Sequence, residues 1–337
     1  LRLLEKLPIL ERVKGKTVAI KMHFGGGMGY STIHPYFVRL LVEYVKKGNP
    51  KNVFVTDQSI KEADRRGYTE ETLGAKLVAS IGDDGKNVVK TETGWDKLPP
   101  VLLGKPILDA DVLINFSHLK GHGDCGFGGA CKNLAMGCVP GSSRRDMHSL
   151  EGSLTWNNEK CIKCNKCIKE CEVKANKFNK NGEYEIFWHH CKMCLHCMLA
   201  CPTGAIKIVK PKFDLFQEGL ARVAMLVLKS FKPEDVFHIN MLTNITLFCD
   251  CWGLTTPSIV PDIGIFAGQD IVAVDHASLK AVKDDIILPG GIPPPFTLGK
   301  KGKHLFERIH RRDPFQQIRA LERLGAGTTK YAVEEVK

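Results

Sequence analysis

The sequence predicts an α/β protein in which a domain built on a parallel sheet is interrupted by a small α+β domain rich in cysteine. Two observations support this fold class. Strand-like and helix-like runs alternate on both sides of residues 156–212, and within that segment cysteines recur at short intervals. A chain of 337 residues is long enough for about two domains. We therefore expect residues 1–155 and 213–337 to form the α/β domain together, with residues 156–212 inserted.

The first elements predict a βαβ unit. Residues 16–24, KTVAIKMHF, are typical of a strand that enters a glycine loop, and HPYFVRLLVEYVKKGNP repeats apolar residues at helical spacing up to a Gly-Asn-Pro stop. NVFVTD is the next predicted strand, and DVLINFSHLK is a later one. Strands connected by such a crossover run parallel, which predicts a parallel sheet.

Candidate catalytic residues follow these strands, because ligands of such sheets bind beyond the carboxyl ends of the strands. Asp57 follows NVFVT, and the predicted catalytic residues at the same edge are Lys21, His23, His118, Lys120 and His122. Any one of them alone could equally be a hydrogen-bonded loop residue. Their shared position at one edge favours a common site.

The segment GHGDCGFGGACKNLAMG predicts a cofactor-binding site. Gly126, Gly128 and Gly129 lead into a predicted helix, ACKNLAM, and bare amides at a helix N-terminus attract an anion or a carboxylate. Lys132 and Asn133 could assist there. The segment is not GxGxxG, so it does not predict a dinucleotide site. The alternative is a glycine-rich turn packed tightly against the insert.

The chain has thirteen cysteines and no sign of secretion, which favours metal or redox chemistry over disulfides. Three cysteines at two-residue gaps and a fourth after three more residues form the bacterial ferredoxin pattern, and it occurs twice, as CIKCNKCIKEC and CKMCLHCMLAC. The fourth cysteine of each run binds the other cluster. We expect one [4Fe-4S] cluster on Cys161, Cys164, Cys167 and Cys201, and a second on Cys191, Cys194, Cys197 and Cys171. Two structural zinc ions are the alternative.

After the insert, NITLFCDCWG and IVPDIGIFAGQDIVAVDHASLKAV predict two more strands and a helix. Cys249 and Cys251 flank Asp250, so on a strand the two thiols would share one face. The three residues could bind an additional metal or act as a redox dithiol. They could also be half-buried residues without a chemical role.

The formal net charge of +11 suggests an acidic partner. Two clusters, each with a core of about +2 on four thiolates, would lower it to roughly +7. Basic residues are not grouped with stacking aromatics, so we expect no nucleic-acid binding. No apolar run is long enough for a membrane span, and we expect a cytoplasmic protein without a membrane partner.

Several segments together carry a family resemblance: KMHFGGGMG, TIHPYFVRLLVEYVKKG, SHLKGHGDCGFGGACKNLAMGC, MHS at 147–149, and CDCWG with IVPDIGI. Over nearly its whole length the chain resembles the uncharacterised iron–sulfur centre proteins, the domain-of-unknown-function family three-six-two with a fused ferredoxin module. The resemblance implies a two-cluster iron–sulfur protein and supplies no reaction.

Three hypotheses of function follow. In the first, an iron–sulfur oxidoreductase carries electrons from an exposed cluster through the second to a pocket that reduces a small anionic or carbonyl substrate. His118 or His122 would donate the proton there, and Lys120 or Lys132 would hold negative charge. In the second, the chain transfers electrons by docking on another oxidoreductase. In the third, it is a metal-handling or maturation protein that uses Cys249, Cys251 and the histidines. A redox partner protein is expected, and a flavin is left open.

Overall fold

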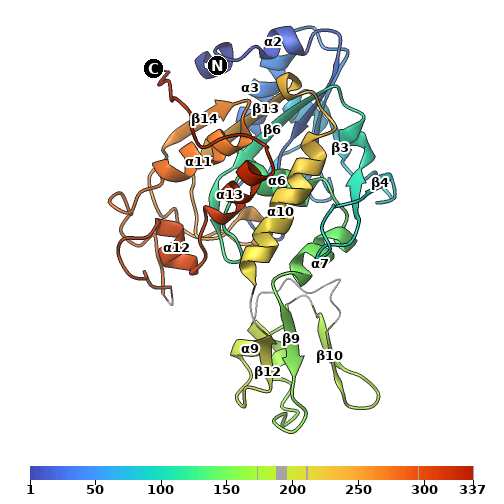
Figure 1. Ribbon diagram of the computed structural model, residues 1–337, viewed down its shortest axis with the longest axis vertical. Helices are drawn as coiled ribbons and strands as arrows, with labels where there is room; N and C mark the ends of the chain where they lie inside the picture. Colours follow the sequence, from blue (N-terminus) through green and yellow to red (C-terminus); the bar gives the residue numbers. More distant parts are fainter. Residues whose placement is uncertain (173, 187–195, 210–211, 295, 337) are drawn as a thin grey trace.

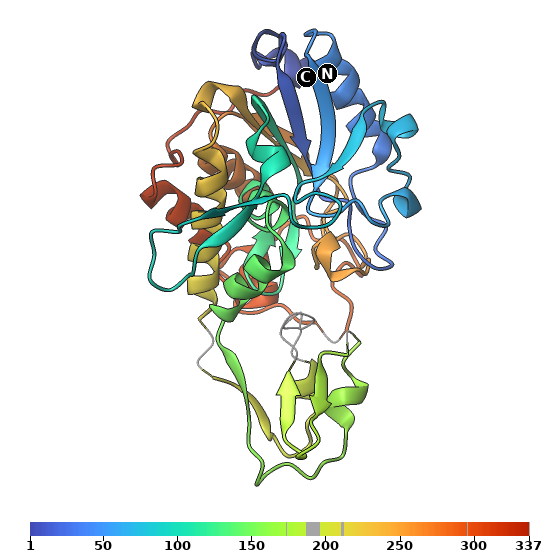
Figure 2. The ribbon, with the colours of Figure 1, turned by 90° about the vertical axis from the view of Figure 1, so that its right-hand side faces the viewer.

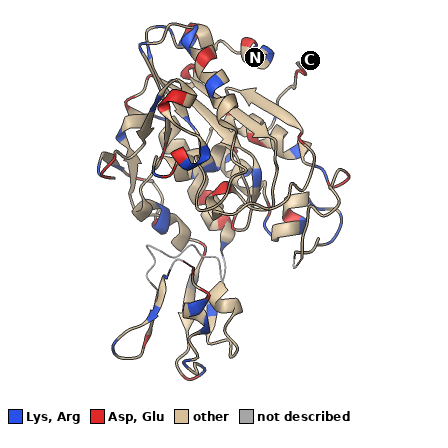
Figure 3. Cartoon of the chain, turned by 180° about the vertical axis from the view of Figure 1, so that it is seen from behind, with Lys and Arg blue, Asp and Glu red and all other residues tan. Residues whose placement is uncertain are grey.

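The computed structural model describes residues 1–337 except 173, 187–195, 210–211, 295 and 337. Figure 1 shows a large α/β part with a small insert projecting from one end, and Figure 2 shows the insert beyond the same end after a quarter turn. Lys and Arg are spread over elements of both parts (Figure 3). In the described parts of the chain, no helix combines the length and apolar character needed to cross a bilayer.

The α/β part is built on a six-stranded sheet in the order β14-β13-β6-β1-β2-β3. Its strands are β1 (Thr17–Lys21), β2 (Asn52–Asp57), β3 (Lys76–Ala79), β6 (Val112–His118), β13 (Val236–Leu242) and β14 (Gly264–Gly268). All neighbours pair in parallel except β13 and β14. The sheet is therefore mixed and mostly parallel, so the predicted parallel sheet is correct apart from its β14 edge.

Helices cover both faces of this sheet, because alternate strand residues belong to two separate apolar cores. In β1, Val18 and Ile20 pack into the core shared with α3 (Pro35–Lys46), whereas Ala19 faces the core shared with α10 (Phe213–Leu228). The remaining helices are α1 (Arg2–Glu5), α2 (Ile9–Arg12), α4 (Glu70–Leu73), α5 (Lys105–Leu108), α6 (Ala130–Gly137), α7 (Gly141–Ser149), α11 (Ile271–Ala281), α12 (Leu305–His310) and α13 (Gln316–Arg323). Two small antiparallel pairs complete this part: β4 (Val88–Thr91) with β5 (Val101–Gly104), and β7 (Lys120–His122) with β8 (Gly126–Gly128).

The insert has its own small core, made by Leu154, Cys167, Cys197 and Ile206. Its elements are β9 (Ser153–Trp156), α8 (Lys166–Lys169), β10 (Asn176–Phe178), β11 (Tyr184–Ile186), α9 (His196–Leu199) and β12 (Ile206–Val209). β9 pairs antiparallel with β12, and β10 with β11. The backbone N of Lys212 donates to the Glu151 carbonyl at 2.9 Å, so the chain enters and leaves the insert at one point.

The structure corrects one predicted strand. NITLFCDCWG is irregular, and Asp250–Trp252 form a 3-10 turn that ends at Gly253, whose φ of 70° lies in the left-handed region. Cys249 and Cys251 therefore do not share the face of a strand. The first strand after the insert is β13, a strand that was not predicted.

Candidate functional site

A cavity of about 370 Å³ opens at the carboxyl ends of β1, β2 and β6. It gathers most of the predicted site residues in its wall: Lys21, His23, His118, His122, Gly128, Gly129, Lys132, Asn133, Cys249, Asp250 and Cys251. The predicted residues Lys120 and Gly126 are not part of the wall. The switch in strand order on either side of β1 explains why the cavity lies there.

Lys21 and Asp57 form a buried ion pair at the base of the cavity. Lys21 Nζ lies 3.1 Å from Asp57 Oδ1 and donates to Asn133 Oδ1 at 2.7 Å, while His23 Nδ1 lies 2.8 Å from Asp57 Oδ2. Burial alone would raise the pKa of Asp57, but Lys21 and His23 outweigh it and hold that pKa well below its usual range. A Cβ at Gly137 would overlap Lys21 Nζ, so only glycine allows α6 to approach this pair.

Asp250 binds two of the predicted catalytic residues. Its Oδ1 accepts from Lys120 Nζ at 2.7 Å, and its Oδ2 lies 2.9 Å from His118 Nδ1. His118 Nε2 contacts the Thr243 carbonyl at 2.6 Å, and Lys120 Nζ also donates to Ser31. Both ring nitrogens of His118 and the Lys120 ammonium are thus engaged by the protein itself. These contacts favour a structural role for Lys120 and His118, which position the turn that carries the two cysteines.

Lys132, His122 and the two cysteines form a dithiol site in the cavity wall. Lys132 Nζ lies 3.6 Å from Cys249 Sγ and 3.4 Å from Cys251 Sγ, and His122 Nε2 lies 3.7 Å from Cys251 Sγ. A hydrogen bond from Cys251 lowers the pKa of Cys249, and Lys132 adds to this effect against burial. The Lys132 ammonium beside the two sulfurs therefore favours the thiolate form of Cys249, which is the usual setting of a reactive cysteine.

His122 is neutral in this site. Burial, with Lys132 next in importance, lowers its pKa well below the usual value. Its Nδ1 accepts a hydrogen bond from the Asp124 backbone N at 3.2 Å, so Nε2 carries the proton and faces Cys251.

The predicted anion site at the start of α6 is already filled by the protein. The backbone N atoms of Ala130 and Cys131 donate to the Asp275 carboxylate at 2.8 and 2.9 Å. The amides of Ala130 and Cys131 are therefore not free for a ligand, whereas the binding role predicted for Gly126, Gly128 and Gly129 stays a prediction. No local pattern predicts this contact, because Asp275 lies in α11, far from α6 in the sequence.

One wall of the cavity consists of residues that were not predicted from the sequence. Arg144, Arg145 and His148 of α7 line it, together with Asp124 from the β7–β8 turn. The arginine pair in GSSRRDMHS was the available signal. Because α7 is the last helix before β9, the cavity wall leads directly into the insert.

Cys161, Cys164, Cys167 and Cys201 line one small hollow of the insert, together with Trp156 and Ile206. Four thiols around a hollow suit a cluster, and the Ala205 backbone N donates to Cys201 Sγ at 3.3 Å. Cys171 and Cys197 are also described, whereas the predicted ligands Cys191 and Cys194 lie outside the described residues.

The two cysteine runs share a backbone pattern beyond their spacing. The Ala175 backbone N donates to Cys171 Sγ at 3.2 Å, as that of Ala205 does to Cys201. Three residues after each of these cysteines the chain is left-handed, at Lys174 with φ 50° and Gly204 with φ 62°. The turn is kept although Pro202 has no counterpart after Cys171. Both runs therefore direct a backbone amide at the sulfur of their fourth cysteine.

Comparisons with known proteins identify a family and a short local relative. A family model described as "Domain of unknown function (DUF362)" matches residues 18–280, well over half of the chain. Over 54 residues the sequence is 43% identical to pyruvate synthase subunit PorD of Methanocaldococcus jannaschii, which covers 16% of this chain and 63% of that subunit. The match thus spans less than two thirds of the relative.

Two solved structures show a distant likeness. The lactate racemase apoprotein from Thermoanaerobacterium thermosaccharolyticum has 14% identity and a TM-score of 0.39, covering 81% of this chain and 54% of that chain. A protein from Thermotoga maritima has 12% identity and a TM-score of 0.31, covering 69% of this chain and 49% of that chain. This chain therefore matches only about half of each structure, and likenesses at these scores do not bear on function.

Proposed function

This chain belongs to the DUF362 family of unknown function, and we propose that it is an iron–sulfur oxidoreductase. Its insert carries electrons to the cavity of the α/β part, where a small anionic or carbonyl substrate is reduced. The observation that carries this proposal is the convergence of Lys132, His122 and two thiols on one cavity. The local match to a pyruvate synthase subunit supports a redox context.

The cysteines of the insert are assigned to two [4Fe-4S] clusters with crossed ligands. One set is Cys161, Cys164, Cys167 and Cys201, and the other is Cys171, Cys191, Cys194 and Cys197. Bound clusters would supply one-electron transfer. The first assignment is supported by the hollow that its four cysteines share. The matching backbone hydrogen bonds to the sulfurs of Cys171 and Cys201 support an equivalent role of these two cysteines in the two runs.

The cavity residues bind and orient the substrate. Lys132 and the arginines of α7 attract an anion, and the neutral His122 donates a hydrogen bond from Nε2 to negative charge that develops during reduction. The Cys249/Cys251 pair lies next to both groups and can release or take up a proton. Lys120 and His118 hold the turn of Asp250 in place.

Anaerobic purification followed by reoxidation kinetics tests this proposal. The protein should contain about eight irons and eight sulfides per chain. After reduction with dithionite, recovery of the cluster absorbance should accelerate when a small anionic carbonyl compound from a panel of 2-oxo acids and aldehydes is added. The variant Lys132→Met should slow this recovery at least about tenfold, since a loss of about 1.4 kcal/mol of anion stabilisation already has that effect.

Lys90→Met is the matched control, because Lys90 is exposed on β4 and lies outside the cavity. It should reoxidise at the wild-type rate. A chain with fewer than about four irons, or equal rates in wild type and Lys132→Met, would contradict the proposal.

Docking on another redox protein is the second candidate function. Ile162 is 66% exposed beside Cys161, and Leu199 is 75% exposed two residues after Cys197. Apolar side chains next to cysteines of the insert suit a transient electron-transfer contact. If no small compound reoxidises the protein but a partner oxidoreductase does, this function replaces the first.

A further inference from the structure

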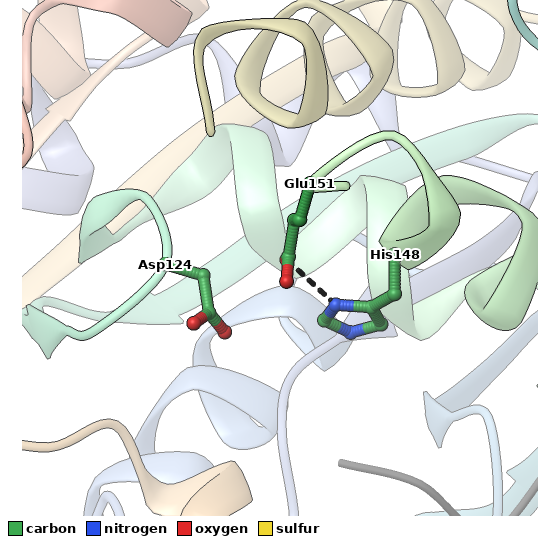
Figure 4. A group of neighbouring side chains, drawn as sticks. All are labelled: Asp124, His148 and Glu151. Carbon is green, nitrogen blue, oxygen red and sulfur yellow. Dashed lines mark hydrogen bonds and ion pairs between the residues drawn. The ribbon is translucent and has the colours of Figure 1, made fainter. Parts of the chain in front are cut away.

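Three groups that commonly bind metals meet at the edge of the cavity, apart from the dithiol site. Asp124 lies in the β7–β8 turn, His148 lies in the last turn of α7, and Glu151 follows that helix. One ligand atom from each, a carboxylate oxygen or a ring nitrogen, lies within 4.8 Å of the others. Figure 4 shows the Glu151 carboxylate between the Asp124 carboxylate and the His148 ring.

Glu151 has an unused acceptor at this point. The residue is fully buried, and its Oε1 lies 2.7 Å from His148 Nδ1. Its Oε2 is buried and has no hydrogen-bond partner among the described residues. An orphaned carboxylate oxygen in the interior is costly, so the site offers an acceptor that no described side chain satisfies and that a bound cation would satisfy.

An ion pair between His148 and Glu151 alone would not explain why a second carboxylate, that of Asp124, is buried beside them. The Asp124 side chain is largely buried, with its Oδ2 3.8 Å from His122 Nδ1, too far for a hydrogen bond. The Glu151 carboxylate repels the charge of Asp124, whereas His148, Lys132 and Arg312 attract it. Two buried carboxylates this close repel one another, and a divalent cation between them would remove that repulsion.

The position of the His148 ring also suits a metal ligand. His148 stacks on Phe216 of α10, with ring centroids 4.8 Å apart and an interplanar angle of 20°. Asp124 and His148 both line the cavity, so coordination positions on that side stay open to small molecules. Ligand atoms around one ion lie roughly 3 to 4 Å apart, so the observed set needs only a small contraction.

We propose that Asp124, His148 and Glu151 bind one divalent transition-metal ion of the Mn²⁺ or Fe²⁺ type at the edge of the cavity. A ligand set of one imidazole and two carboxylates suits these ions better than it suits metals that prefer thiolate ligands. This site differs from the Cys249–Asp250–Cys251 metal site expected from the sequence, where both Asp250 oxygens are already engaged. The proposal stands without the reductase function, and the ion would polarise a bound carbonyl if that function holds.

Titration of the anaerobically purified full chain with Mn²⁺ tests the site. Free Mn²⁺ is followed by its electron paramagnetic resonance signal, with the clusters in their oxidised, diamagnetic form. Wild type should bind one ion per chain. The isosteric variants Asp124→Asn and Glu151→Gln should weaken binding at least about 100-fold, since even outer-shell partners of metal ligands are worth 10–100-fold.

Asp146→Asn is the matched control, because Asp146 is a carboxylate of the same helix that pairs with Arg145 and is not in the group of three. It should bind Mn²⁺ as wild type does. If Glu151→Gln fails to fold, Asp124→Asn and His148→Gln decide the question. Absence of binding at about 1 mM Mn²⁺, or binding that Asp124→Asn leaves unchanged, would overturn the proposal. Iron and sulfide contents of the same samples report on the insert separately, so the two proposals can fail independently.

Discussion

Lys21 and Lys120 are fully buried lysines, and each faces a carboxylate at the carboxyl edge of the sheet. Asp57 neutralises the first and Asp250 the second, and a histidine contacts each carboxylate as well. A buried ammonium without a counter-charge would cost several kcal/mol. These two ion pairs therefore hold the chain in place at the ends of the strands. Lys132, in contrast, lies beside the thiols of Cys249 and Cys251.

The pKa of Asp57, held well below its usual range, predicts a pH dependence of stability. A depressed folded-state pKa stabilises the protein above the unfolded value of 3.8, and that contribution is lost as the pH falls through the folded value. Asp57→Asn should lower the free energy of unfolding by about 3–5 kcal/mol at pH 6. The difference from wild type should narrow below about pH 4, as measured by urea denaturation. A difference that stays constant from pH 6 to pH 3 would show that the charge of Asp57 does not contribute.

At the scale of elements, α6 connects the core to the cavity. Its N-terminal amides bind Asp275 of α11, Gly137 near its end admits Lys21, and Lys132 and Asn133 on its side reach the cavity. The position of the Lys132 ammonium therefore depends on how firmly α6 is held.

Asp275→Ala should destabilise the protein by about 2–5 kcal/mol, because two buried amides would lose their acceptor. Asp275→Asn keeps one acceptor oxygen and should cost less. Asp270→Ala is the comparison. Asp270 precedes α11 and caps it by accepting from the Ala273 backbone N, and it also accepts from the exposed Thr328 backbone N, so its loss should cost only about 1 kcal/mol. Urea unfolding of the three variants gives this order, and equal losses for Asp275→Ala and Asp270→Ala would contradict it.

The sequence predicts the elements well where a local pattern decides them. The apolar period of residues 35–46 predicted α3, and the polar residues at the carboxyl ends of β1 and β6 predicted the position of Lys21, His23 and His118. The prediction of a strand at Cys249–Cys251 was wrong, because Asp250–Trp252 form a 3-10 turn that Gly253 ends with its left-handed backbone. Composition alone did not reveal this turn.

The remaining site residues depend on contacts between distant parts of the chain. Asp124, His148 and Glu151 each have an ordinary local context, and only the packing of α7 against α10 and the β7–β8 turn brings them together. Asp275 reaches α6 in the same non-local way. No periodicity or spacing in the sequence encodes such meetings, so the sequence located the edge of the sheet but not the full wall of the cavity.

At the scale of the whole molecule, the α/β part and the insert have separate cores. The two strands that border the α/β part, β9 and β12, pair with each other, and Lys212 binds Glu151 across the junction. The sheet of the α/β part is thus complete without any strand of the insert.

Replacing residues 153–211 by a short Gly-Ser linker should therefore leave a folded α/β part without iron. Circular dichroism should show cooperative thermal unfolding of this shortened chain. Deletion of residues 88–104, the β4–β5 pair, is the comparison, because Val101 and Leu103 belong to the large core and their removal should abolish folding. An insert deletion that unfolds as completely as the β4–β5 deletion would show that the two parts are not independent.

The closed junction of the insert also affects the rate at which the sheet can form. β6 and β13 are neighbours in the sheet, yet the whole insert lies between them in sequence. The insert makes mostly local contacts, and once folded it joins residues 151 and 212 and removes roughly half of the loop that must close. Halving a loop saves about 0.6 kcal/mol of closure entropy. Early folding of the insert, which iron uptake would promote, thus speeds the pairing of β6 with β13 and shortens the time for which both edges are open to other chains.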